Sequence, residues 1–227
     1  MPTVLITGAN RGIGLALSKE FLNHDWQVLA CCRQPDQAEA LISLACSNLS
    51  IHNLDVGNDC SIEDLAKSLH GTPIDVLLNN AGIAGDEEHN TFGNMNYESW
   101  AEVFNINTMA PMKMLEAFID NVESSEQKHV ANISSGLASI AAQEGYMFPY
   151  SVSKAALNST MKSLSVILKD RVRINLFTPG WVQTDMGGSD APLQVHQSAE
   201  LLYKNITGID PTVTGKFISH EGNEYPW

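Results

Sequence analysis

The sequence is short of basic residues and of long apolar runs. Lysine and arginine number 13 against 26 aspartates and glutamates, so the formal net charge is −13 over 227 residues. A surface of this sign repels phosphate backbones and anionic membranes, and we expect neither nucleic acid nor membrane as a partner. No apolar stretch approaches the ~18 residues that span a bilayer. No basic segment followed by an apolar run indicates a signal peptide.

Cysteines are also few. Cys31, Cys32, Cys46 and Cys60 show neither CxxC spacing nor a histidine cluster, so no metal site is expected. Reduced thiols fit a cytoplasmic protein. Charged residues make up 17% of the chain and apolar residues 44%, as in a compact folded protein. We therefore expect residues 1–227 to form a single domain around one core.

Strand-like and helical patterns alternate along the chain, with a polar surface loop expected over residues 85–96. Such alternation predicts an α/β fold with a parallel sheet covered on both faces, and ligands at the carboxyl ends of its strands. Apolar, β-branched runs predict strands at residues 2–7, 27–32, 51–56, 74–78, 129–134, 173–178 and 215–219. Apolar periodicity predicts helices at residues 15–22, 36–45, 61–69, 97–122, 150–168 and 199–203.

A glycine-rich turn joins the first strand to the first helix. Gly8, Gly12 and Gly14 are spaced GxxxGxG, and Asn10, Arg11 and Ile13 lie between them. Glycines let the backbone approach a pyrophosphate, and a helix N-terminus supplies free N–H groups and partial positive charge. The pattern therefore favours dinucleotide binding, although a glycine-rich turn can also be purely structural.

Arg33 bears on the choice of cofactor, because it directly follows the second predicted strand. An acidic residue at this strand end binds a ribose 2′-hydroxyl, whereas an arginine accepts a 2′-phosphate. With Arg11 in the glycine turn, Arg33 predicts NADP(H) in preference to NAD(H).

Tyr150 and Lys154 lie one turn apart if the segment is helical. At ~4 Å and an effective dielectric of ~20, the ammonium attracts a phenolate by ~4 kcal/mol. That attraction could lower the tyrosine pKa by up to about three units, against which burial acts. The same spacing also occurs on solvated helix faces, so the pair alone does not establish catalysis.

Further motifs follow in a fixed order, and with the glycine turn they resemble the short-chain dehydrogenase/reductase family over nearly the whole chain. They are Asp55-Val56, Asn79-Asn80-Ala81-Gly82, Asn107, Ser135, Tyr150 with Lys154, and Pro179-Gly180 with Thr184. The segments 179–188 and 215–227 resemble the carbonyl-reductase branch that includes C-factor and sniffer-type enzymes. The resemblance implies a single Rossmann-type, doubly wound, seven-stranded parallel sheet.

The resemblance also implies catalytic roles. Tyr150 would protonate the substrate carbonyl oxygen while Ser135 donates a hydrogen bond to it. Lys154 would lower the tyrosine pKa and bind the nicotinamide ribose, and Asn107 would anchor a water that relays protons to Lys154. Ser135 precedes Tyr150 by 15 residues, a longer separation than is common in the family, so Ser134 remains an alternative.

The remaining implied contacts are with the cofactor. Asp55 and Val56 would contact adenine, Asn80 the neighbouring ribose region, and Val182 and Thr184 the carboxamide. Gly82 is also expected to bind the cofactor. The expected substrate is a small carbonyl or alcohol, held between residues 136–148 and 184–197. The resemblance also implies a homodimer or homotetramer through the helix after Tyr150. Small side chains on that helix would permit close packing against a partner; they are Ala155, Ala156 and Ser159.

The leading prediction is an NADPH-dependent carbonyl reductase. An alcohol or hydroxysteroid dehydrogenase would use the same residues in the oxidative direction. A C-factor-like signalling or cofactor-sensing protein is a third possibility, against which the presence of all four catalytic residue types argues.

Overall fold

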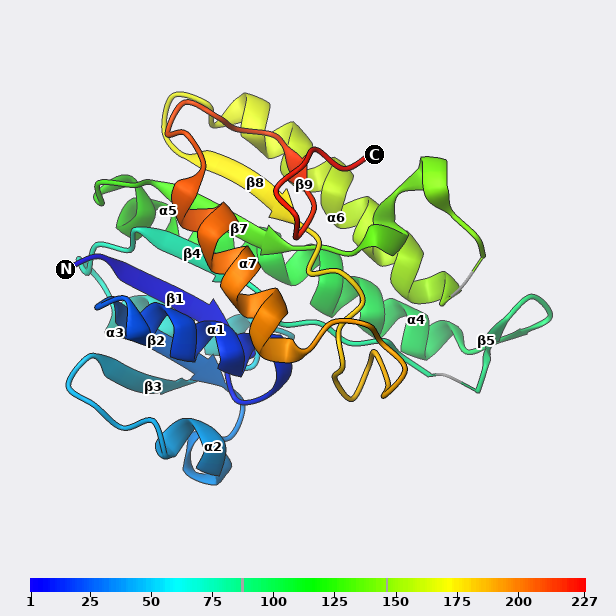
Figure 1. The fold of residues 1–227 in the computed structure, drawn as a ribbon, viewed down its shortest axis with the longest axis horizontal. Coiled ribbons are helices and arrows are strands. Elements are labelled where there is room, and N and C mark those ends of the chain that lie inside the picture. The colour runs from blue at the N-terminus through cyan, green and yellow to red at the C-terminus, as the bar shows by residue number, and fades with distance from the viewer. Residues whose placement is uncertain (87, 146) are drawn as a thin grey trace.

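Seven strands form one parallel sheet in the computed structural model, which describes residues 1–86, 88–145 and 147–227. The strands are β1 Thr3–Thr7, β2 Gln27–Cys32, β3 Leu49–Asn53, β4 Val76–Asn79, β7 His129–Ile133, β8 Arg173–Phe177 and β9 Phe217–Ile218. Their order is β3-β2-β1-β4-β7-β8-β9 (Figure 1), and the direction of winding changes between β1 and β4. Ligands of such sheets bind beside this point, at the carboxyl ends of the strands.

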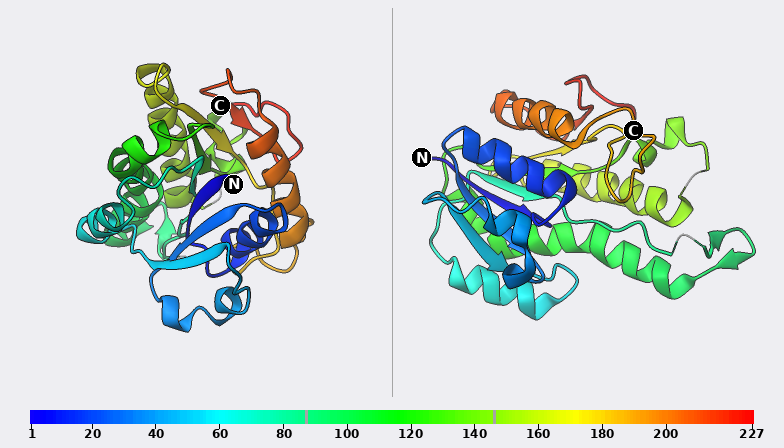
Figure 2. Two further views of the ribbon diagram at one scale, coloured as in Figure 1. Left: turned by 90° about the vertical axis from the view of Figure 1, so that its left-hand side faces the viewer. Right: turned by 60° about the horizontal axis from the view of Figure 1, so that its bottom comes forward.

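Helices cover both faces of the sheet (Figure 2). Successive strand residues point to opposite sides, so Leu5 packs with Phe118 on one face, whereas Ile6 packs with Phe21 and Leu202 on the other. The predicted doubly wound α/β fold is thus confirmed. The helices are α1 Gly12–Asn23, α2 Glu39–Ile42, α3 Asp59–Ser68, α4 Tyr97–Phe104, α5 Ala110–Glu123, α6 Phe148–Ile167 and α7 Val195–Gly208. Those with residues in the Leu5 cluster are α3, α5 and α6, and those in the Ile6 cluster are α1, α2 and α7.

Several elements differ in extent from the sequence prediction, and local structure explains three of these differences. The helix predicted at 36–45 shrinks to α2 after a 3-10 turn at Pro35–Gln37, because Ala38 between them has a non-helical backbone (φ −84°, ψ 58°). β3 ends before Asp55, whose N–H bonds to the Ser61 hydroxyl and turns the chain out of the sheet. α7 begins four residues earlier than predicted, after a capping box formed by Gln194 and Gln197.

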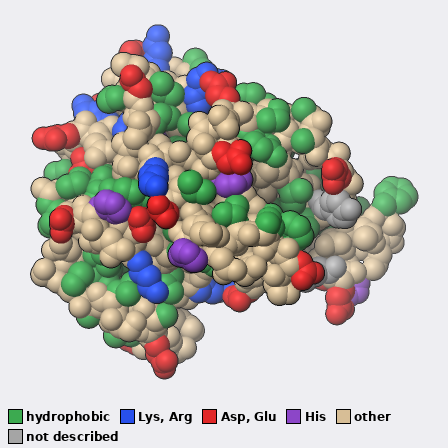
Figure 3. Space-filling model, viewed as in Figure 1, with side chains coloured by type: hydrophobic (Ala, Val, Ile, Leu, Met, Phe, Trp, Pro, Cys, Tyr) green, Lys and Arg blue, Asp and Glu red, His purple; other side chains and the backbone are tan. Residues whose placement is uncertain are grey.

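The segment predicted as a surface loop contains a small hairpin. β5 Asn90–Thr91 pairs with β6 Asn94–Met95, and Gly93 supplies the turn with φ +87°. The hairpin projects from the body of the molecule and carries an exposed apolar side chain at its end (Figure 3), Phe92. Glu87 of this predicted loop and Tyr146 of the predicted substrate segment lie outside the described residues.

The long helix predicted at 97–122 is interrupted by a π-helical segment, Asn105–Met109, between α4 and α5. Asn107 and Thr108 are buried there, and the Thr108 hydroxyl donates to the Ser153 carbonyl oxygen of α6 at 2.8 Å. Widened turns of this kind re-aim the side chains that they carry. The interruption thus directs Asn107 toward α6.

Two kinds of feature are absent from the described residues. None of the helices there is long and apolar enough to span a membrane. Over the same residues, histidine, cysteine and carboxylate side chains form no group of three that could hold a metal ion.

Candidate active site

The turn after β1 has glycines at the positions where a side chain would be strained or would collide with the backbone. Gly8 and Gly12 have φ values of +66° and +53°, which favour glycine. A Cβ on Gly14 would lie 2.2 Å from the carbonyl oxygen of Gly8, so α1 starts directly against the end of β1. Asn10 is exposed, and Ile13 packs on the core. The N–H groups at the start of α1 meet a turn whose glycines have no side chains, which suits a pyrophosphate.

Asn80 secures this turn from the neighbouring strand. Its side-chain nitrogen donates to the carbonyl oxygens of Thr7 (2.9 Å) and Gly8 (3.2 Å). The Thr7 hydroxyl in return accepts from the N–H groups of Asn80 and Ala81, both at 3.0 Å. The described contacts of the Asn80 amide thus position the glycine turn, a role distinct from the predicted ribose contact.

Gly82 brings the chain close to two predicted catalytic residues. A Cβ at this position would lie 3.2 Å from Oδ1 of Asn107 and 3.5 Å from Nζ of Lys154. Any larger residue would therefore crowd both side chains. The end of β4, the π-helical segment and α6 meet at this point.

The side chain of Asn107 is fully buried and extensively hydrogen-bonded. Its Oδ1 accepts from the N–H of Ile83 at 2.9 Å, and its Nδ2 donates to the Ile83 carbonyl oxygen at 2.9 Å. Nδ2 also donates to the Ser153 hydroxyl at 3.0 Å. These bonds fix the chain after Gly82 to α6, next to Lys154.

Lys154 is buried beside Tyr150. Its Nζ lies 5.9 Å from the centre of the Tyr150 ring and donates to the carbonyl oxygen of Ile133 at 2.8 Å. Burial lowers the pKa of Lys154 to about 8. The ammonium form therefore still predominates at neutral pH, although burial disfavours it.

The pKa of Tyr150 differs in direction from the sequence-based estimate. Burial raises the pKa of its phenol above the ordinary value, and a hydrogen bond with Ser135 acts in the opposite direction. The value from charge alone was an upper limit that burial was expected to oppose, and in the structure burial prevails. In the structure Lys154 donates to Ile133, and desolvation of the tyrosine dominates.

The two serines at the end of β7 have different environments. The Ser134 hydroxyl is buried and donates to Oδ1 of Asn158 at 2.6 Å. Ser135 is half-buried; its Oγ accepts from the N–H of Leu137 at 3.2 Å, and Ser135 is close enough to Tyr150 to act on the pKa of its phenol. The structure thus places Ser135, and not Ser134, against the tyrosine.

The predicted adenosine contacts lie at the ends of β2 and β3. Arg33 is exposed, and its carbonyl oxygen accepts from the Asn53 amide at 2.8 Å. Within the described part of the chain, no ion pair involves Arg33. Asp55 and Val56 are half-buried, and Asp55 Oδ1 accepts from the N–H of Gly57 at 3.0 Å. Arg33 is thus available to an anionic ligand.

Arg11 is placed differently from Arg33. Its guanidinium forms an ion pair with Asp185, which belongs to the loop between β8 and α7. Both side chains are exposed, so the pair is worth little energetically. The ion pair nevertheless joins the glycine turn to the loop between β8 and α7.

Val182 and Thr184 lie in the same loop. Val182 is buried and forms a bridge with Leu193. The Thr184 hydroxyl accepts from the N–H of Gly187 at 3.1 Å, and its methyl carbon would lie 3.7 Å from a Cβ on Gly12. This loop therefore faces the glycine turn, as a carboxamide contact requires.

Two residues that organise the site were not singled out from the sequence. Thr7 ties the ends of β1 and β4 together. Ser153 accepts from Asn107 and donates to the Tyr150 carbonyl oxygen at 2.7 Å. The available signals were the position of Thr7 beside the glycine turn and that of Ser153 beside Lys154. The partners of Thr7, and Asn107 as the partner of Ser153, are distant in sequence.

These groups fit a nicotinamide dinucleotide. The glycine turn and the start of α1 would hold the pyrophosphate, Arg33 would face a 2′-phosphate, and Lys154 would reach a ribose. Tyr150 and Ser135 present two hydroxyl groups beside one another, as protonation of a carbonyl oxygen requires.

Comparisons with known proteins bear on the family and the fold of the chain. A family model described as short chain dehydrogenase matches residues 2–193. The protein named C-signal, from Myxococcus xanthus, is 37% identical over 157 residues, which cover 68% of this chain and 93% of the relative.

Two solved structures are similar over the full chain. Carbonyl reductase Sniffer of D. melanogaster has a TM-score of 0.93 and 33% identity, with 100% of both chains covered. NADPH-bound carbonyl reductase from chicken fatty liver has a TM-score of 0.92 and 33% identity, covering 100% of this chain and 99% of the other.

Proposed function

Because the chain belongs to the short-chain dehydrogenase family, we propose that it is an NADPH-dependent carbonyl reductase with Tyr150 as proton donor. The observation that carries this proposal is the group formed by Tyr150, Ser135 and Lys154 at the carboxyl end of the sheet. The carbonyl-reductase neighbours, one of them described as NADPH-bound, support the same reaction class.

In the proposed reaction, NADPH held by the glycine turn would supply the hydride for the carbonyl carbon of an aldehyde, ketone or quinone. Tyr150 gives its hydroxyl proton to the carbonyl oxygen, and an alcohol results. Ser135 donates a hydrogen bond to the same oxygen, where negative charge develops. Lys154 stabilises the phenolate that remains on Tyr150. Asn107 holds the chain after Gly82 in place and, with a water, returns a proton toward Lys154.

The raised pKa of Tyr150 suits a proton donor. A phenol with a raised pKa stays protonated at neutral pH, so the reducing direction starts from the correct form. Lys154, with a pKa of about 8, retains its charge in most molecules at pH 7. The same residues would serve an alcohol dehydrogenase, for which Tyr150 would have to start as phenolate.

We propose NADP(H) over NAD(H) because Arg33 is exposed at the end of β2. NADP-bound or NADPH-bound structural neighbours support this preference. A charge-assisted hydrogen bond contributes ~1.5 to 3 kcal/mol. One arginine is therefore worth about 10- to 100-fold in affinity.

A second candidate function is signalling or cofactor sensing, favoured by the 37% identity to C-signal. The test is oxidation of NADPH by the purified protein with a panel of aldehydes, quinones and diketones, and the reverse reaction with NADP⁺ and alcohols. Turnover with a carbonyl, lost in Tyr150→Phe, is expected. Tight NADPH binding without turnover on any substrate would favour sensing.

We also propose that copies of this single-domain chain associate through α6 into a homodimer or homotetramer. Ser159 is exposed, and Ala155 and Ala156 are half-buried, so a second helix could approach closely there. Light scattering should give a multiple of the chain mass for wild type. Ser159→Arg should shift the protein toward the monomer, and a monomeric wild type would contradict the proposal.

A further inference from the structure

The chain after β9 turns back along that strand. Gly222 has φ +89°, and a bridge then joins Ile218 to Glu224 in the antiparallel sense. The N–H of Tyr225 donates to the Phe217 carbonyl oxygen at 2.7 Å. Residues 223–227, which we call the tail, thus form a strip beside β9 (Figure 1).

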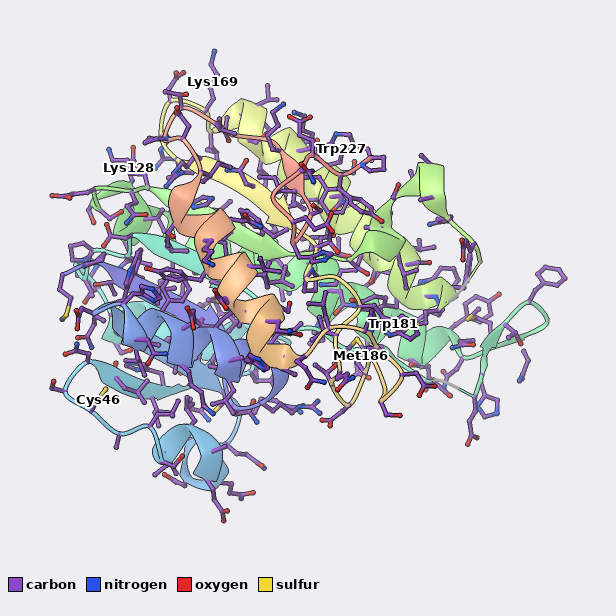
Figure 4. All side chains as sticks on the ribbon, viewed as in Figure 1. Cys46, Lys128, Lys169, Trp181, Met186 and Trp227 are labelled. Atoms are coloured by element: carbon purple, nitrogen blue, oxygen red, sulfur yellow. The ribbon has the colours of Figure 1, made fainter. Side chains whose placement is uncertain are left out.

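Aromatic contacts fix the tail in place. The Phe217 ring lies 5.2 Å from the Tyr225 ring and 5.7 Å from the Trp227 ring, measured between centres. Nζ of Lys162, on α6, lies 5.8 Å from the Trp227 ring centre, and Trp227 lies beside α6 (Figure 4). Tyr225 is half-buried against the core. The tail is therefore packed on both β9 and α6.

The tail contacts the segment that follows Ser135. The main-chain oxygen of Trp227 accepts from the N–H of Ala141 at 3.2 Å and from the Ser139 hydroxyl at 3.3 Å. A Cβ on Gly136 would lie only 3.1 Å from the Tyr225 hydroxyl oxygen. Tyr225 thus lies over the residue next to Ser135, where glycine gives it room.

Ser135 depends on this segment for its orientation. It has an extended backbone, and its Oγ accepts from the N–H of Leu137 within the short turn Gly136–Ala138. A movement of that turn would carry the Ser135 hydroxyl away from Tyr150. The tail lies on the turn at Gly136 and is bonded to the chain again at Ser139 and Ala141.

We propose that Tyr225 and Trp227 are positioning residues, which hold residues 136–141 so that the Ser135 hydroxyl faces Tyr150. This proposal rests on the proposed carbonyl reductase function, in which Ser135 contacts the substrate oxygen. The packing of the Tyr225 ring carries the effect, and Trp227 anchors the far end of the segment.

The first test is kinetic and uses the full-length protein. A single hydrogen-bond donor to a developing oxyanion is worth about 100- to 1,000-fold in kcat. Tyr225→Ala should lose a part of this, roughly tenfold or more, with NADPH affinity unchanged. Tyr225→Phe keeps the ring and should retain wild-type turnover. The matched control is Glu224→Gln, a substitution on the same tail that breaks the ion pair between Glu224 and Lys216. It should have no effect on turnover.

A double substitution separates positioning from general structural damage. If Tyr225 acts through Ser135, Tyr225→Ala should cost little more in a Ser135→Ala protein. An equal loss in both backgrounds would overturn the proposal, as would unchanged turnover in Tyr225→Ala. Should Tyr225→Ala fail to fold, the same comparison is made with Trp227→Ala, whose side chain is partly exposed.

The second test does not depend on activity. Hydrogen exchange at the amides of residues 137–141 should be faster in Tyr225→Ala and Trp227→Ala than in wild type and Glu224→Gln. Unchanged exchange there would overturn the proposal even if turnover fell. A wild-type protein without carbonyl reduction would contradict the proposed function, while faster exchange in the variants would still show that the tail holds this segment.

Discussion

The Ser134 hydroxyl donates a 2.6 Å hydrogen bond to the buried side-chain oxygen of Asn158. This bond joins the end of β7 to α6 and leaves the neighbouring Ser135 hydroxyl to contact Tyr150. We therefore expect the two adjacent serines to have separable roles, Ser134 in stability and Ser135 in the proposed chemistry.

The serine pair gives the first prediction. Ser134→Ala leaves a buried acceptor on Asn158 without its donor, so the free energy of unfolding should fall by about 1 to 3 kcal/mol while kcat changes little. Ser135→Ala should lower kcat about 100- to 1,000-fold with little change in stability. Urea unfolding and steady-state kinetics on both variants measure this, and equal kinetic losses would contradict the assignment.

The second prediction concerns Tyr150→Phe. Removing the hydroxyl should lower kcat roughly 100- to 10,000-fold because the general acid is lost. NADPH affinity should remain, since the ring and Lys154 are retained. Fluorescence titration of NADPH and turnover with a verified carbonyl substrate check the two halves, and near-normal kcat would rule out Tyr150 as the donor.

The third prediction concerns Arg33→Asp. The new carboxylate repels a 2′-phosphate and can accept from a 2′-hydroxyl, so NADPH affinity should fall by at least 10- to 100-fold while NADH affinity stays equal or improves. Asp185→Asn, which frees Arg11 from its ion pair, should instead strengthen NADPH binding. Titration of the wild type and the variants with NADPH and NADH measures these affinities. Equal affinities for the two cofactors in the wild type would show that Arg33 does not bind the 2′-phosphate.

The fourth prediction links Lys154 to stability. Its pKa is about 8 in the folded protein, against ~10.4 when unfolded. Below pH 8 both states carry the charge and folding must bury it. As the pH rises through 8 toward ~10.4 the folded protein loses the proton first, so the free energy of unfolding should rise by about 3 kcal/mol.

Lys154→Met removes this titrating group. The stability difference between variant and wild type should therefore shift by the same amount, in favour of wild type, between neutral and alkaline pH. Urea unfolding at several pH values measures the shift, with the exposed Lys169→Met as control. A difference that does not vary with pH would show that Lys154 titrates normally.

The order of strands and helices could be predicted because each has a local pattern. The residues at which strands and helices begin and end depended on single contacts, which the hydrophobic pattern of the sequence does not reveal. Asp55 leaves the sheet because its N–H finds the Ser61 hydroxyl, and α7 starts where Gln194 and Gln197 cap each other. The π-helical segment around Asn107 arises from packing between α4, α5 and α6, and a continuous helical periodicity conceals it.

The sequence predicted which residues form the candidate site. It did not predict the direction of the pKa shift of Tyr150 or the hydrogen-bond partners of the site residues. The spacing of Tyr150 and Lys154 gave the correct neighbours, but the direction of the tyrosine pKa depends on burial by residues from other strands and helices. The partners of Asn80 and Asn107 lie on other elements, so their hydrogen bonds could not be inferred locally.

The central place of β1 has a consequence for synthesis of the protein on the ribosome. Thr3–Thr7 is made before β4, with which one of its edges pairs, and the N–H of Thr3 donates to the side chain of Asp75, 72 residues later. At ~5 to 20 residues per second, roughly 4 to 14 s pass before that partner exists. During this interval the nascent chain carries an apolar strand with an unpaired edge, so this segment is where a chaperone is most needed.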